Sequence, residues 1–149
     1  MSDFVLRIHP ANANHVPAGA EIDAGLGALR QWLPAAERIR ARTFDTVRFI
    51  DAGGNWDGVS CSACGEDAEA WWSDAMSVAH SGGFSSLRLS APCCGATVSL
   101  DSLHYGWPVG FARFEYEIHN PGVAELGPGD LGRLEAMLGC RLRVVPARV

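Results

Sequence analysis

The chain has 149 residues, of which 48% are hydrophobic and 19% are charged, a composition typical of a soluble globular protein and unlike that of a disordered one. It contains no apolar run near the ~20 residues of a membrane-spanning helix, and its first residues lack the features of a signal peptide, so we expect one cytoplasmic domain, residues 1–149. Seventeen acidic and twelve basic residues give a formal net charge of −5, which is the wrong sign for a protein that binds phosphate backbones.

Three elements are predicted before the first cysteine. Residues 4–8 are rich in β-forming side chains, which predicts a strand. Apolar residues at helical spacing predict a helix over residues 22–33, closed by Pro34. Alternating apolar residues predict a half-buried strand over residues 46–50, and the turn-forming residues 51–58 follow it.

The rest of the chain predicts a second series of elements. Residues 66–80 have the clearest helical pattern, with acidic residues in the first turn and two glycines after the end. Strands are predicted at residues 84–90, 96–100 and 111–118. Asp130 is predicted to cap a further helix that ends at Gly139, and residues 141–145 predict a last strand.

The order of elements is therefore β-α-β, a cysteine-bearing segment, and β-α-β again. Short stretches around His9 and His119 are similar to each other, but two such matches do not establish a repeat. This order predicts an α+β fold with a mixed or mainly antiparallel sheet, about three helices and an inserted segment that carries the cysteines.

Four of the five cysteines form two tight pairs that both end in Cys-Gly, Cys61-Ser-Ala-Cys64-Gly65 and Pro92-Cys93-Cys94-Gly95. In a Cys-x-x-Cys-Gly turn both thiolates project toward one point, and glycine allows the positive φ angle that the turn needs. Two such turns supply four soft ligands for a tetrahedral ion. The sequence therefore predicts a metal site made by Cys61, Cys64, Cys93 and Cys94, with zinc as the preferred metal.

This segment, residues 59–100, resembles the zinc-ribbon and treble-clef class of structural zinc sites. The resemblance implies a structural Zn²⁺ ion held by two cysteine knuckles. The second turn departs from the pattern because Ala91 stands where the first cysteine of a Cys-x-x-Cys motif belongs. The cysteine pairs, residues 103–114 and Asn120-Pro121 also resemble a group of uncharacterised bacterial proteins, a resemblance that implies no particular activity.

Other interpretations of the cysteines stay open. If only one cysteine of the second pair binds the metal, His80 or His104 is the candidate fourth ligand. The alternatives to zinc are unrelated buried thiols, a redox-active first pair placed just before a helix, and an iron–sulfur site. Cys140, which follows the predicted last helix, is expected to be a core residue.

Four thiolates close the coordination shell and leave no position for a reactive water, which favours a structural over a catalytic zinc. The sequence also lacks the motifs of phosphate-binding loops, zinc proteases and nucleobase deaminases. We therefore expect a small protein–protein interaction module, such as an adaptor or an inhibitor. The candidate partner-binding residues are Trp71, Tyr105 and Trp107, which lie near the cysteines in the sequence.

Two other functions stay open. A hydrolase-like enzyme would use an acid–base pair formed by Asp101 and His104, or a zinc ion with a bound water. A nucleic-acid-binding ribbon would use the basic residues between Arg38 and Arg48, where Arg38, Arg40 and Arg42 alternate as on one face of a strand. The oligomeric state is not predicted.

Overall fold

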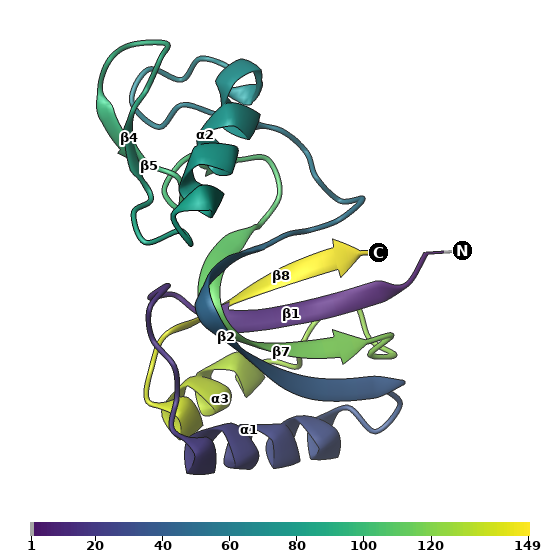
Figure 1. Cartoon of the computed structure of the whole chain (residues 1–149). Coiled ribbons are helices and arrows are strands. Elements are labelled where there is room, and N and C mark those ends of the chain that lie inside the picture. The colour runs from purple at the N-terminus through teal and green to yellow at the C-terminus, as the bar shows by residue number, and fades with distance from the viewer. Residues whose placement is uncertain (1) are drawn as a thin grey trace.

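The computed structural model describes residues 2–149 (Figure 1). Met1, the first residue of the predicted single domain, lies outside this range. The helices are α1 (Gly19–Trp32), α2 (Glu69–Ser81) and α3 (Asp130–Leu138). The strands are β1 (Phe4–Pro10), β2 (Arg38–Ile50), β3 (Val59–Ser60), β4 (Arg88–Ser90), β5 (Thr97–Ser99), β6 (His104–Tyr105), β7 (Gly110–His119) and β8 (Leu142–Arg148).

The main sheet has four strands in the order β2-β7-β1-β8, and every neighbouring pair is antiparallel. As a result β1 and β2 run parallel with β7 between them, while β7 and β8 run parallel with β1 between them. Helix α1 joins the first of these pairs and α3 joins the second. This is the β-α-β-β-α-β arrangement of ferredoxin-like folds. The predicted α+β fold with a mainly antiparallel sheet is confirmed.

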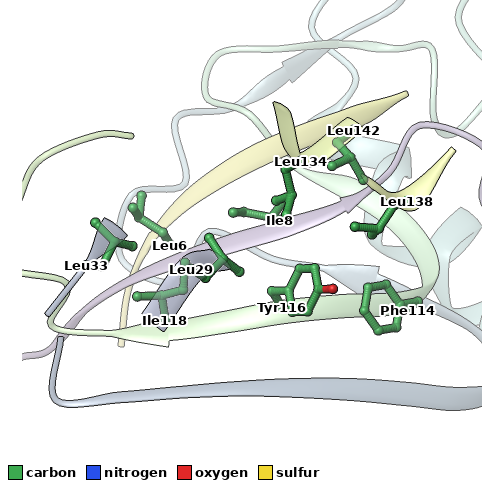
Figure 2. Packing of buried hydrophobic residues seen from close by; sticks show 10 residues of the cluster. All are labelled: Leu6, Ile8, Leu29, Leu33, Phe114, Tyr116, Ile118, Leu134, Leu138 and Leu142. Atoms are coloured by element: carbon green, nitrogen blue, oxygen red, sulfur yellow. The ribbon is translucent and has the colours of Figure 1, made fainter. Parts of the chain in front are cut away.

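Helices α1 and α3 cover one face of this sheet (Figure 1). The core between helices and sheet is drawn in Figure 2 and consists of Leu6, Ile8, Leu29, Leu33, Phe114, Tyr116, Ile118, Leu134, Leu138 and Leu142. Every second residue of β1 and β7 points into this core, as the period of a strand requires. Within it the hydroxyl of Tyr116 donates a hydrogen bond to the Ile22 carbonyl oxygen, with an O···O distance of 2.7 Å.

The opposite face of the sheet carries a network of ion pairs around two buried glutamates. Arg7 of β1 donates from Nη1 to Glu115 at 3.2 Å and to Glu117 at 2.9 Å, both on β7. Arg40 and Arg42 of β2 also donate to Glu117, at 2.7 Å and 3.2 Å. Glu115 is 1% exposed and Glu117 is 2% exposed, whereas the Arg40 and Arg42 side chains remain partly exposed, so buried carboxylates are paired with arginines that reach the surface.

The segment that follows β2 covers the edge of β8. Gly53 and Arg148 form a parallel bridge, the Gly54 N–H donates to the Arg148 carbonyl at 2.8 Å, and the Arg148 N–H donates to the Ala52 carbonyl at 3.1 Å. These bonds satisfy backbone groups that a bare edge strand would leave open for pairing with another chain.

Several elements differ in length from their predictions. The strand predicted at residues 46–50 begins at Arg38, because the alternating arginines pair with β7. The strand predicted at residues 84–90 shrinks to β4, since Phe84 has a φ angle of +53° and belongs to the turn that ends α2. The helix predicted from residue 66 begins at Glu69, because Asp67 forms a bridge with Ser60 instead.

Residues 51–109, called the cysteine lobe below, lie between β2 and β7 in the chain and stand above the sheet in Figure 1. The lobe holds α2 and two small antiparallel pairs of strands, β3–β6 and β4–β5. Its core reaches down to Phe49 and Phe111, whose rings lie 5.3 Å apart where β2 and β7 enter the lobe. Within residues 2–149, no helix is both long enough and apolar enough to cross a membrane.

Candidate metal centre

The first cysteine turn begins at Cys61, directly after β3. The Gly65 N–H donates to the Cys61 carbonyl at 2.9 Å, and Gly65 has the predicted positive φ angle, +78°. Hydrogen bonds from the backbone N–H groups of Cys64 and Ala63 to its sulfur lower the pKa of Cys61 to about 7. The turn therefore both directs this sulfur and stabilises it as a thiolate, which is the form that binds metals.

The second cysteine turn connects β4 and β5 and repeats the hydrogen bonds of the first. The Gly95 N–H donates to the Ala91 carbonyl at 2.7 Å, as Gly65 does to Cys61 in the first turn. Gly95 has a φ angle of +75°. Ala91 therefore fills the backbone position of a first knuckle cysteine, and Cys93, two residues later, provides the sulfur that this position lacks.

The two turns bring the four cysteine sulfurs together. All four Sγ atoms lie within 4.8 Å of one another, with 3.9 Å between Cys61 and Cys94 and 3.5 Å between Cys64 and Cys93. A tetrahedral site with Zn–S bonds of about 2.3 Å has S···S edges of about 3.8 Å. A disulfide is far shorter, at about 2.05 Å. The group therefore has the donor atoms and the spacing to hold a metal ion such as zinc.

The histidines considered as alternative ligands lie elsewhere in the lobe. His80, at the end of α2, packs its ring against Phe84 with centroids 5.7 Å apart. His104 is in β6, opposite Ser60 of β3. Among the described residues, the group that could hold a metal consists of the four cysteines. Cys140 packs at the margin of the sheet core, as expected.

Two of the three aromatic residues predicted for partner binding make hydrogen bonds inside the molecule. The Tyr105 hydroxyl accepts a bond from Trp72 Nε1 at 3.1 Å and donates to the Leu100 carbonyl at 2.5 Å. Trp107 Nε1 donates to the Pro146 carbonyl at 2.7 Å, which ties the lobe to β8. Their polar atoms are thus used to hold the lobe together.

Trp71 lies instead in an apolar groove between α2 and the β4–β5 pair, called the Trp71 groove below. The groove has a volume of about 510 Å³. Its apolar walls are formed by Trp71, Ala75 and Val78 of α2 and by Leu89, Pro92 and Leu100 opposite them. The indole N–H of Trp71 is buried and has no acceptor within residues 2–149. The groove therefore offers a mainly apolar surface to a binding partner.

Asp101 and His104, the residues proposed for an acid–base pair, are not hydrogen-bonded to each other within residues 2–149. The Asp101 carboxylate accepts a hydrogen bond from the Ser99 hydroxyl instead. An acid–base pair needs a direct contact or a bridging water.

The basic stripe of β2 is largely compensated. Arg40 and Arg42 pair with Glu117, and the guanidinium groups of Arg42 and Arg48 lie over the Phe44 ring, 5.1 Å and 4.3 Å from its centroid. Sequence reasoning missed the acidic partners of this stripe. The alternation of Glu115 and Glu117 along the predicted strand 111–118 was visible in the sequence. It could not be matched to the arginines without knowing that the two strands are neighbours in the sheet.

Fold and site together define an α+β protein with a ferredoxin-like sheet and a four-cysteine cluster in an inserted lobe. No protein-family model matches the chain, and comparison with curated proteins and with solved structures gives no significant match. The likeness to zinc ribbons therefore rests on the two cysteine turns, and membership of a particular family stays a prediction.

Proposed function

We propose that the protein is a zinc-stabilised interaction module, in which Cys61, Cys64, Cys93 and Cys94 hold a structural Zn²⁺ ion and the Trp71 groove receives a protein partner. The observation that carries the metal assignment is the clustering of the four sulfurs within 4.8 Å of one another, with two S···S distances of 3.9 Å and 3.5 Å that are close to the edge of about 3.8 Å in a tetrahedral zinc–thiolate site. The retention of four thiols is also consistent with a reducing compartment such as the cytoplasm.

A structural role for the ion follows from what the cysteines connect. Cys61 and Cys64 follow β3, whereas Cys93 and Cys94 connect β4 and β5, so one ion would join two pairs of very short strands. Isolated two-stranded pairs are only marginally stable in water. Every residue of α2 keeps some exposure to solvent, so apolar burial alone gives this helix limited support. Metal binding would supply the missing stability.

An interaction role is favoured over the two alternatives by the surroundings of the cluster. Four sulfur ligands leave no site for a zinc-bound water, and two of the arginines of β2, Arg40 and Arg42, are already paired with Glu117. The Trp71 groove, in contrast, presents apolar walls beside the second cysteine turn. Exposed apolar patches with an aromatic anchor are common at protein-binding surfaces.

The metal half of the proposal is tested by zinc content and thiol titration of protein purified without added zinc. We expect one zinc per chain and four thiols that react only after unfolding. Cys94→Ser should lose both the metal and the protection, whereas the matched change Cys140→Ser, outside the cluster, should keep both. Absence of metal together with freely reacting thiols in the folded protein would refute the assignment.

The interaction half is tested with Trp71→Ala, which empties one wall of the groove. Recovery of a bound partner should fall, while Val123→Ala, at an exposed apolar residue outside the groove, should leave it unchanged. Equal recovery with both variants, at full zinc content, would count against the groove as the binding surface.

A further inference from the structure

We infer that the partner received by the Trp71 groove is a second copy of this chain, related by a two-fold axis that places Val78 of each copy in the groove of the other. This inference rests on the proposed interaction function and names its partner. It requires that one surface patch contain both the projecting group and the recess, because in a two-fold interface the same patch meets itself.

Val78 provides the projecting group. It is 75% exposed, more than the other exposed large hydrophobic residues of the described chain, Val123, Met137 and Val149. It also borders the groove of about 510 Å³. A large apolar side chain held out beside an apolar recess leaves both surfaces in water, and a two-fold pairing would bury both at once.

The charges at the groove are arranged for the same pairing. Asp74 lies on the α2 side and Arg88 lies on the β4 side, and both are exposed. Within residues 2–149 neither of them takes part in an ion pair. A two-fold axis through the groove sets Asp74 of one copy against Arg88 of the other, twice. Two chains of net charge −5 repel each other, so a local match of opposite charges is what their association needs.

The shape of α2 permits a close approach. The residues that line the groove along this helix include Ala75 and Ala79, with Gly82 at its end, and small side chains allow a second helix to pack at short range.

Other occupants satisfy fewer of these groups. A basic protein would pair with Asp74 but would repel Arg88. A small apolar ligand would fill the recess but would leave Val78 in water. A second copy satisfies the recess, the projecting valine and both charges together.

The experiment is light scattering after size exclusion, combined with sedimentation velocity, on the full zinc-loaded chain over a range of concentrations. Wild type should show twice the mass of one chain. Val78→Asp should give the single-chain mass, whereas the matched change Val123→Asp, away from the groove, should leave the double mass. Zinc content and thiol protection of each sample show whether the lobe is folded, so loss of the metal site and loss of dimerisation are read separately.

A charge exchange gives the more specific test. Asp74→Arg and Arg88→Asp should each weaken dimerisation at least about tenfold, because each sets like charges together twice. An equimolar mixture of the two variants should dimerise again, since every contact then joins opposite charges. A single-chain mass for zinc-loaded wild type, or a mixture that stays as weak as its components, overturns the inference. A complex with a basic protein or a small ligand in place of the dimer does the same.

Discussion

Glu115 and Glu117 lie two residues apart on one face of β7, yet their acidities are shifted in opposite directions. Burial raises the pKa of Glu115 to about 7, although the charge of Arg7 opposes this shift. Burial would also raise the pKa of Glu117, but hydrogen bonds from His119 and Arg40 and the charge of Arg7 lower it to about 2. Glu117 is thus stabilised as a carboxylate by most of the positive partners, whereas Glu115 is protonated below about pH 7.

This difference predicts a pH-dependent stability. An unfolded Glu115 ionises near pH 4.5 and the folded one near pH 7, so between these values the folded state holds a proton that the unfolded state has released. The free energy of unfolding therefore falls as pH rises through this window. Glu115→Gln keeps a neutral side chain, so its stability relative to wild type should rise from pH 5 to pH 7 and then level off.

Urea denaturation of zinc-loaded protein at several pH values measures this difference. The matched change Glu125→Gln, at an exposed site, should give a difference that does not vary with pH. A flat difference for Glu115→Gln as well would show that this carboxylate does not titrate in the window. The contribution of Glu117 runs the other way, because it is present above pH 4.5 and is lost as pH falls toward 2.

The equivalence of Ala91 and Cys61 in the two cysteine turns predicts that the fourth ligand can be moved. Cys93→Ala should release the metal, because three sulfurs remain. The double change Ala91→Cys with Cys93→Ala restores a regular Cys-x-x-Cys motif at a position whose backbone bonds match those of Cys61, so zinc binding should return. Zinc titration with a colorimetric competitor measures both. If the double variant binds no better than Cys93→Ala, the second turn does not direct a side chain at residue 91 toward the cluster.

Removal of the metal should unfold the cysteine lobe and leave the sheet intact. The core around Leu6, Tyr116 and Ile118 is distinct from the core of the lobe, and the pairing of β1 with β7 and with β8 involves no lobe residue. Addition of a strong zinc chelator should therefore increase amide hydrogen exchange in α2 and β4 by orders of magnitude while β1 and β7 keep their protection. Equal loss of protection in the sheet would show that the lobe and the sheet unfold as one unit.

Two glycines of α1 should respond in opposite ways to the same substitution. A Cβ atom at Gly25 would lie 2.9 Å from Leu138 Cδ1 and would also collide with the Tyr116 hydroxyl, which is fixed by its bond to Ile22. Gly25→Ala should destabilise the protein by about 1–3 kcal/mol. Gly27 has open space around it, so Gly27→Ala should stabilise by about 0.5–1 kcal/mol. Denaturant unfolding of both variants checks the sign, and equal effects would contradict the packing at Gly25.

The sequence by itself determined the features that depend on a few neighbouring residues. The two Cys-Gly turns were predictable because their hydrogen bonds close within five residues and require glycine at the last position. The alternation of residues 111–118 and the periodicity of residues 22–33 indicated which faces are buried, because each is a property of one strand or one helix. From these patterns the α+β class and the cysteine group followed.

Only the tertiary structure decided which of these faces meet. Arg7 and Glu117 are opposite each other because β1 pairs with β7. These two residues are more than a hundred positions apart in the sequence, so their contact depends on the order of the strands and on the packing of the two helices against the sheet. The tertiary structure also decided the surroundings of the aromatic residues. The local sequence does not show which of Trp71, Tyr105 and Trp107 makes hydrogen bonds inside the molecule. The Tyr105 hydroxyl accepts a hydrogen bond from Trp72 and the Trp107 indole donates one to Pro146, both in distant segments, whereas Trp71 lines the groove. Local sequence sets the turn and the periodicity, whereas the contacts between distant segments depend on the burial of the whole chain.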